Sequence, residues 1–325
     1  MRQWTTGGGR VLLGAAAGLA ALAACGGDRG AGQAAGGADT TAAADTTPLS
    51  AAIAHTVDSL EAPEAARFDP ELGVYFVSNI NGSPLAKDGN GYISRITRDG
   101  QVDSLKFIAG GRGGAKLDAP KGIAIQGDTL WVADIDAARA FDRRSGKPIA
   151  TVSLVGKAKF LNDAALGPDG AIYFTDTGFG DDGKGGMDHS GPDRVFRVEG
   201  RKATVALEFK DKPGPNGLTW DSAGSTFVIV PFQATSIFRW APGDSAPTVV
   251  TEGPGMMDGI EALGSGRFVV STWTDSSLFV LEGDKITKLV GGLPSPADIA
   301  FDAEGGRIAV PLLMENRVEF VDLKR

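Results

Sequence analysis

The 325-residue sequence is poor in the side chains that form crosslinks and soft metal sites, with one Cys and two His. Because Cys25 is the only cysteine, no intramolecular disulfide can form within the chain. The same scarcity excludes a zinc site built from Cys and His ligands and a Ser-His-Asp triad. The formal net charge is −8 and no basic run is present, so nucleic acid is not an expected partner.

The first 24 residues have the layout of an export signal. A basic start at Arg2 and Arg10 precedes an apolar run over residues 11–24. This run spans only ~21 Å as a helix, against ~30 Å for a bilayer core, so we expect it to be cleaved. The tetrapeptide at residues 22–25 resembles the lipobox of bacterial lipoproteins, which implies lipidation of Cys25. An ordinary signal peptide that contains a Cys is the alternative.

Three segments are therefore expected: a lipoprotein signal peptide over 1–24, a lipidated Cys with a flexible tether over 25–47, and one folded domain over 48–325. The tether is rich in Gly, Ala and Thr and has little to bury. Loss of Arg2 and Arg10 moves the formal charge from −8 to about −10. We expect an exported protein, anchored by lipid at the periplasmic face or the outer surface of the envelope.

Six short β-branched and aromatic runs recur through the rest of the chain, with almost no helical periodicity. They cover residues 74–77, 130–133, 172–175, 227–230, 268–271 and 308–310. A similar phrase with a polar residue precedes each run, at a period of ~40 to 50 residues. This pattern predicts an all-β, six-bladed β-propeller with four-stranded antiparallel blades, in preference to a β-sandwich.

The last unit ends at residues 318–323 and is one strand short. Residues 51–60 precede the first phrase and are expected to supply that strand, closing the ring from the N-terminal side. Two insertions, residues 81–92 and 178–193, are rich in Gly, Asp and Lys and are interpreted as loops over one face. The Trp residues on the strand patterns, including Trp273, are interpreted as blade packing.

The first strand of every propeller blade lines the central channel, so the six polar phrase residues should converge there. We call them the axial residues; they are Glu64, Lys121, Asn162, Asn216, Asp258 and Asp298. Their carboxylate and amide oxygens suit Ca²⁺, Mg²⁺ or Mn²⁺. A divalent cation together with Lys121 would neutralise the three carboxylates. The alternative is that each residue only caps a turn, because Asn-Gly and Asp-Gly are common turn pairs.

The chain resembles the SMP-30/gluconolactonase/LRE-like family over nearly all of residues 60–323. The resemblance rests on Glu64 five residues before Asp69, and on the phrases Phe160-Leu161-Asn162-Asp163, Pro215-Asn216-Gly217-Leu218 and Met257-Asp258-Gly259. It implies a catalytic cation, with Ca²⁺ as first choice, held by Glu64, Asn162, Asn216 and Asp258. Two features depart from the family pattern: Ala65-Ala66 replaces a Gly-Pro, and Lys121 has no obvious equivalent.

The function expected from these residues is metal-dependent hydrolysis of lactones or related esters. Asp258 or Asp298 would act as the base on water, while Lys121 and Asn162 orient the substrate. The alternative is a non-catalytic propeller with a structural ion that binds a small anionic ligand or a protein, and Lys121 suits an anion in either case. His55 and His189 are expected at the surface, and the protein is expected to be a monomer.

Overall fold

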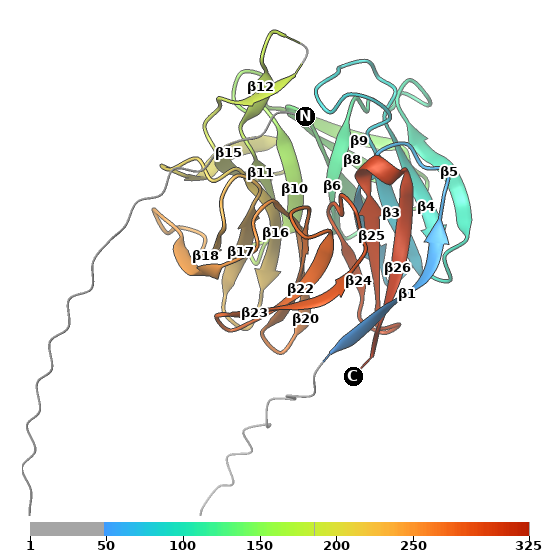
Figure 1. The fold of residues 1–325 in the computed structure, drawn as a ribbon. Coiled ribbons are helices and arrows are strands. Elements are labelled where there is room, and N and C mark those ends of the chain that lie inside the picture. Colours follow the sequence, from blue (N-terminus) through green and yellow to red (C-terminus); the bar gives the residue numbers. More distant parts are fainter. Residues whose placement is uncertain (1–48, 185, 325) are drawn as a thin grey trace, which may run out of the picture. The chain divides into compact units, whose positions relative to one another are not determined.

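The computed structural model describes residues 49–184 and 186–324 (Figure 1). The expected signal peptide, the lipidation site at Cys25 and the whole of the tether lie outside these residues. The single helical segment in the described part is the 3-10 turn η1 (Leu313–Glu315). No helix among the described residues is long and apolar enough to cross a membrane.

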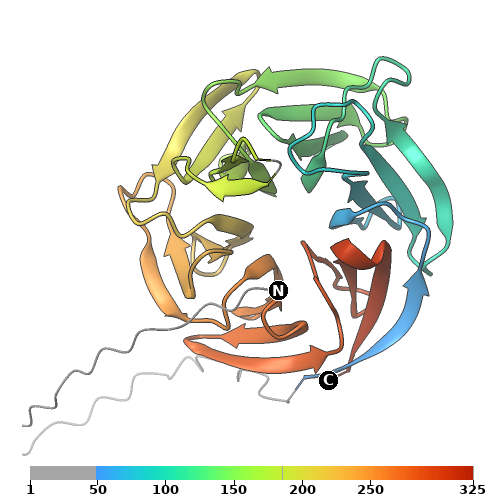
Figure 2. The same cartoon turned by 45° about the horizontal axis from the view of Figure 1, so that its top comes forward.

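The predicted six-bladed β-propeller is confirmed: six four-stranded antiparallel sheets stand around a common axis (Figure 2). Blade 1 contains β2 (Pro63–Asp69), β3 (Val74–Asn79), β4 (Tyr92–Thr97) and β5 (Val102–Ala109). Blade 2 contains β6 (Pro120–Gln126), β7 (Thr129–Asp134), β8 (Ala137–Asp142) and β9 (Pro148–Ser153). Blade 3 contains β10 (Leu161–Leu166), β11 (Ile172–Asp176), β14 (Arg194–Glu199) and β15 (Lys202–Glu208).

The second half of the ring repeats the same order of strands. Blade 4 contains β16 (Pro215–Asp221), β17 (Thr226–Pro231), β18 (Ser236–Trp240) and β19 (Thr248–Glu252). Blade 5 contains β20 (Met257–Gly264), β21 (Arg267–Thr272), β22 (Ser277–Glu282) and β23 (Lys285–Gly291). Blade 6 contains β24 (Ala300–Asp302), β25 (Arg307–Leu312), β26 (Arg317–Lys324) and β1 (Ser50–Val57).

The outermost strand is the least buried strand of each blade. The innermost strand β2 is buried at six of its seven positions, whereas the outermost strand β9 is buried only at Val152. The core lies between the faces of neighbouring blades, as where Trp131 of blade 2 and Phe174 of blade 3 share one apolar cluster. Both faces of an inner strand are covered by neighbours, which explains why these strands are rich in small and apolar residues.

The N-terminal strand closes the ring, as the short last repeat predicted. Strand β1 pairs antiparallel with β26, in a register that runs from Ser50 opposite Lys324 to Val57 opposite Val318. Two side-chain contacts fasten this outer strand: Thr56 donates to Glu319 at 2.6 Å, and a ring nitrogen of His55 lies 3.1 Å from the carbonyl of Gly100 in blade 1. Joining the two ends of the domain in one sheet completes the sixth blade and so closes the ring.

An ion pair across the same seam gives the stability of the propeller a pH dependence. Burial alone would raise the pKa of Asp302, but the paired Arg98 and the backbone amide of Gly305 outweigh burial and hold it below its ordinary value. Stability from a lowered pKa is present above the unfolded value of ~3.9 and is lost as pH falls. We therefore expect Asp302→Asn to lower the melting temperature at pH 7, with the difference from wild type shrinking towards pH 3. Melting curves across this range check it, and an unchanged difference would contradict it.

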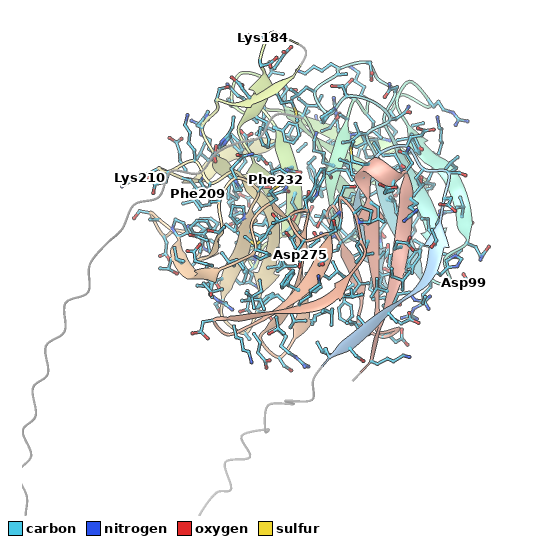
Figure 3. All side chains as sticks on the ribbon, viewed as in Figure 1. Asp99, Lys184, Phe209, Lys210, Phe232 and Asp275 are labelled. Atoms are coloured by element: carbon cyan, nitrogen blue, oxygen red, sulfur yellow. The ribbon has the colours of Figure 1, made fainter. Side chains whose placement is uncertain are left out.

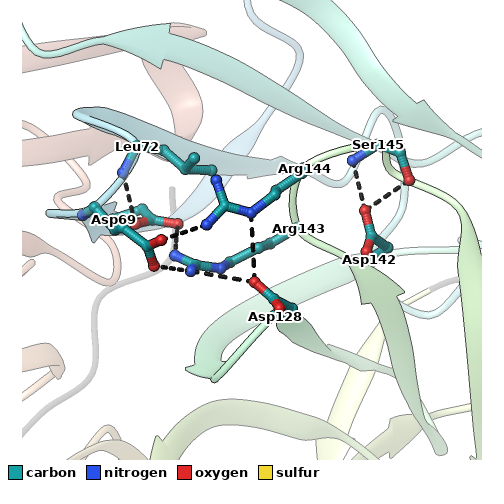
Figure 4. Close-up of polar contacts among 8 residues, drawn as sticks. Asp69, Leu72, Asp128, Asp142, Arg143, Arg144 and Ser145 are labelled. Atoms are coloured by element: carbon teal, nitrogen blue, oxygen red, sulfur yellow. Dashed lines mark hydrogen bonds and ion pairs between the residues drawn. The ribbon is translucent and has the colours of Figure 1, made fainter.

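A second charged cluster joins blades 1 and 2 (Figure 4). Arg143 follows β8 and is 5% exposed, and it donates to Asp69 Oδ2 at 2.6 Å. Asp69 is the last residue of β2 and is fully buried; its other oxygen accepts the backbone amides of Glu71 and Leu72. The Asp69 carboxylate thus stabilises the turn after β2 in blade 1 and also binds the guanidinium of Arg143 in blade 2.

The second insertion forms a structure of its own, so its interpretation as a simple loop was incomplete. Strands β12 (Phe179–Asp181) and β13 (Met187–His189) pair as a hairpin that projects beyond the blades, with Lys184 near its tip (Figures 1 and 3). Asp182 accepts the backbone amides of Lys184 and Gly186, which stabilises the turn. The first insertion, which links β3 to β4, contains no strand before Tyr92, where β4 begins.

Candidate metal centre at the propeller axis

Five of the six axial residues occupy equivalent places in the blades: each is the second residue of its innermost strand, in blades 1 to 5. Asp298, the sixth, stands two residues before β24 and pairs directly with blade 1, donating its amide to Glu64 O at 2.9 Å. All six side chains are at most 7% exposed. The fold therefore brings this set to one end of the central channel.

A β-bulge accompanies the axial position in each of blades 1 to 5, where pairing with the second strand shifts register. A bulge re-aims the side chains beside it and frees a backbone amide. In three blades the amide after the axial residue is satisfied by a hydroxyl of the second strand, at 2.8–2.9 Å; the hydroxyls belong to Ser78, Thr175 and Ser271. The bulges are thus stabilised rather than strained.

The glycine that follows three axial residues allows neighbouring inner strands to approach each other. A Cβ on Gly122 would lie 2.4 Å from Asp163 Cα, and one on Gly217 would lie 2.4 Å from Asp258 O. Gly259 is crowded in the same way by Asp298 Cα at 2.7 Å. Asn216-Gly217 and Asp258-Gly259 lie inside β16 and β20, so the turn-pair alternative is wrong.

Several axial oxygens are buried without a hydrogen-bond partner among the described residues. They are Glu64 Oε2, Asn216 Oδ1, Asp258 Oδ1 and both carboxylate oxygens of Asp298. Asn162 donates from Nδ2 to Thr177 Oγ1 at 3.0 Å, and this bond leaves its amide oxygen unused. Buried polar groups are nearly always satisfied in native proteins, so converging oxygens of this kind are suited to a cation.

The raised pKa values of the axial carboxyl groups also indicate that the described residues leave their negative charge without enough partners. Burial raises the pKa of Glu64 well above its ordinary value; Asp258 adds to the rise and Lys121 opposes it. Burial also raises the pKa of Asp258 to about 8, against the opposing hydrogen bond from Trp273. No three Asp, Glu, His or Cys side chains in residues 49–184 and 186–324 are grouped so as to hold a metal alone. An ion here would need the amide oxygens of Asn162 and Asn216 beside Glu64 and Asp258.

Lys121 is fully buried in the ring. Among the described residues its ammonium forms hydrogen bonds to carbonyl oxygens but no ion pair with a carboxylate. Its Nζ donates to Ala119 O at 3.0 Å and to Pro84 O at 3.2 Å, and lies 4.2 Å from the ring centroid of Phe160. Burial lowers the pKa of Lys121, while Glu64 and Asp134 raise it in part. An ammonium has three donors, so one remains for a ligand.

Comparison with known proteins decides the family. The family model described as the SMP-30/Gluconolactonase/LRE-like region matches residues 89–304, which is more than half of the chain. This chain belongs to the SMP-30/gluconolactonase/LRE-like family. The matched region contains five axial residues, and Glu64 precedes it. No curated protein matches the chain.

Solved structures share the fold of this family member at low sequence identity. A gluconolactonase from Xanthomonas campestris is 18% identical, with a TM-score of 0.63 over 86% of this chain and 96% of that one. An inactive virginiamycin B lyase from Staphylococcus aureus, solved with quinupristin, is 17% identical, with a TM-score of 0.55 over 85% and 99%. The nidogen/laminin complex contains a chain that is 16% identical, with a TM-score of 0.57 over 80% and 84%. These likenesses show the fold alone.

A charged cluster that the sequence analysis missed lies beside the axial ring of this family member. Arg67 forms an ion pair with Glu261, and its NH2 lies 3.9 Å from both Asp163 Oδ1 and Asp298 Oδ2. Asp163 also accepts the amide of Leu218 at 2.6 Å, which links blades 3 and 4. Asp298 therefore faces this cluster as well as the ring. Arg67 and Glu261 also line a cavity of ≈ 540 Å³. Its other walls include the C-terminal ends of β2 and β16, which are the ends away from the axial residues.

Three more residues make contacts that the sequence did not predict. Trp273 follows β21 and donates from Nε1 to Asp258 Oδ2 at 3.0 Å, so it orients an axial side chain rather than serving blade packing alone. Both histidines are only partly exposed: His55 contacts Gly100, and His189 Nε2 lies 2.7 Å from the buried Asp193 Oδ1. No motif around Trp273 or Asp163 signals these contacts, because they depend on pairing between strands.

Proposed function

We propose that this protein is a divalent-metal-dependent hydrolase of lactones or related esters, with Ca²⁺ as first choice and Mg²⁺ or Mn²⁺ as alternatives. The observation that carries the proposal is the set of buried, unpartnered oxygens of Glu64, Asn216 and Asp258 at the channel end. Together with Asn162 they offer only hard oxygen donors, which fits these cations. Membership of a family that includes gluconolactonases supports the lactone class of substrate.

A bound cation would supply Lewis-acid polarisation of the substrate carbonyl. Lys121 would direct its remaining N–H toward a substrate oxygen as negative charge develops there, and Asn162 would help to orient the same group. Either Asp258 or Asp298 would accept the proton of the attacking water. Asp298 has both oxygens free of hydrogen bonds among the described residues and a pKa raised by burial and by Asp163, which makes it the stronger candidate base.

Replacing Lys121 by Met separates catalysis from metal binding. The variant loses the donor but keeps most of the volume, so we expect kcat/KM for a lactone to fall about 10²-fold. Metal affinity should be retained or increased, because a cation is removed from the ring. Kinetics and calorimetry on the same preparations measure both quantities. Unchanged kcat/KM would contradict a substrate-orienting role for Lys121.

We also propose that Cys25 carries the lipid anchor and holds the propeller at the cell envelope. The lipobox-like sequence before Cys25 supports this. Cys25→Ser is expected to abolish incorporation of a labelled fatty acid and to release the protein from the membrane fraction. If the variant still incorporates the labelled fatty acid, Cys25 is not the lipidation site.

The experiment that tests the proposed function uses the full chain after treatment with a chelator. Ca²⁺, Mg²⁺ and Mn²⁺ are titrated by calorimetry, and a panel of aldonolactones and acyl lactones is assayed with and without each ion. Metal binding with metal-dependent turnover supports the hydrolase. Tight metal binding without turnover of any lactone or ester would favour the non-catalytic, anion-binding propeller that Lys121 also suits. If none of the three ions binds, the proposed axial metal site is contradicted.

A further inference from the structure

A second ring of side chains surrounds the axial residues at the same end of the channel. In five blades the residue directly after the second strand is apolar; these residues are Ile80, Ile135, Phe232, Trp273 and Leu313. Blade 3 has Thr177 at this place, and Phe179 follows two residues later. Second strands run antiparallel to the first, so they end where the axial residues begin. We call these five residues and Phe179 the apolar collar.

The collar is aromatic along blades 3 to 5. Phe179 packs edge-on against Phe160 at 5.6 Å between ring centroids and against Phe232 at 6.4 Å. Phe232, labelled in Figure 3, packs edge-on against Trp273 at 5.6 Å. Phe179, Phe232 and Trp273 are all partly exposed, so this arc presents ring surface rather than burying it completely.

The collar is aliphatic along blades 6, 1 and 2. Ile80, Ile135 and Ala119 form one buried cluster, against which Leu85 and Leu313 pack while remaining partly exposed. Leu85 belongs to the insertion between β3 and β4, so the insertion adds apolar surface to this side. Apolar contacts thus surround the polar ring through all six blades.

The aromatic arc is joined to the axial residues by direct contacts at both of its ends. At one end of the aromatic arc, Phe160 lies under the ammonium of Lys121, at 4.2 Å from Nζ to the ring centroid. At the other end, Trp273 donates its only N–H to Asp258. A substrate group held by Lys121 near Asp258 would therefore extend onto aromatic surface whose indole N–H is already used.

We infer that the substrate is a lactone or ester with an apolar substituent, an alkyl chain or an aryl group, that lies on the apolar collar. This inference rests on the proposed hydrolase function and narrows its substrate class. A polyhydroxylated aldonolactone would lose water from its hydroxyl groups against the collar and find no hydrogen-bond partners in return. An alkyl chain gains from leaving water in proportion to its length.

The test compares kcat/KM for γ-lactones with side chains from methyl to octyl and for glucono-δ-lactone, using the full chain. Phe232→Ala removes collar surface without touching an axial residue. Phe301→Ala is the matched control, because Phe301 is also a partly exposed Phe but lines a separate cavity beside Leu49 and Arg267. We expect kcat/KM to rise about tenfold or more along the series, and Phe232→Ala to lose most of this rise while Phe301→Ala keeps it.

A binding measurement separates failure of this inference from failure of the hydrolase proposal. The probe is 3-octylcyclopentanone, in which a CH₂ group replaces the ring oxygen of the γ-octyl lactone; it keeps the carbonyl and the position of the chain but has no ester bond to hydrolyse. If no lactone is turned over but the ketone binds wild type at least about tenfold more tightly than Phe232→Ala, the hydrolase proposal fails while the collar is still shown to bind an apolar substituent. A flat chain-length series, a preference for glucono-δ-lactone, or ketone binding equal in both proteins would overturn the inference.

Discussion

Asp258→Ala should abolish metal-dependent lactone hydrolysis, with kcat/KM at least about 10³-fold below wild type. The residue supplies a buried, unpartnered carboxylate oxygen to the axial ring and is oriented by Trp273. Its removal takes away half of the carboxylate charge of the proposed ligand set, leaving Glu64 as the single anionic ligand. Steady-state kinetics at saturating Ca²⁺, with calorimetry for the ion, measure the two losses together.

Without metal, we expect the same variant to lose no thermal stability, although a buried side chain has been shortened. In the metal-free protein, folding buries the Asp258 carboxyl beside Glu64, and the raised pKa of Asp258 shows that burial opposes its charge. Asp258→Ala should therefore be at least as stable as wild type without metal, and Ca²⁺ should raise the melting temperature of wild type alone. Asp221→Ala is the matched control: Asp221 ends β16, is 7% exposed and pairs with Arg239. It should keep the activity, and equal inactivation of both variants would contradict a specific role for Asp258.

Arg143→Met is expected to reduce the free energy of unfolding by about 3 kcal/mol. Arg143 is the cation that faces the fully buried carboxylate of Asp69, and methionine fills its place without a charge. Asp69 then remains buried with only backbone amides for partners. The midpoint of urea unfolding, at unchanged slope, measures the loss.

The neighbouring Arg144 provides the control for this prediction. It also pairs with Glu71 and Asp128, but its side chain is 48% exposed, so Arg144→Met should change stability little. Adding Asp69→Asn to Arg143→Met should recover part of the loss, because the unpaired buried charge is then removed. Equal effects of the two Arg variants would show that the buried pair does not join the blades.

The sequence was sufficient to predict the propeller, because each repeat by itself indicates one blade. Six polar phrases, each followed by a β-branched run, indicate six equivalent blades, and the short last repeat indicates closure by the N-terminal strand. The same logic placed Glu64, Lys121, Asn162, Asn216 and Asp258 at one channel end, where the structure has them. Their roles in metal binding and catalysis stay predictions.

Features that depend on contacts between strands or between blades were not predictable. The Asn-Gly and Asp-Gly pairs match a turn as well as a strand, and only the approach of Asp258 O to Gly217 explains the glycine. The ion pair of Arg67 with Glu261 joins residues 194 positions apart, and no local pattern marks either one. Trp273 resembles any strand aromatic until its indole N–H is seen to donate to Asp258.

The most direct test of the axial metal centre is anomalous diffraction from crystals of the full chain grown with Mn²⁺. We predict one strong peak at the axis, with Glu64, Asn162, Asn216 and Asp258 oxygens within ~2.1–2.6 Å. The same crystals soaked with excess Ca²⁺ should lose the peak as Ca²⁺ replaces Mn²⁺. No peak at the axis, in a preparation that hydrolyses lactones, would contradict the account.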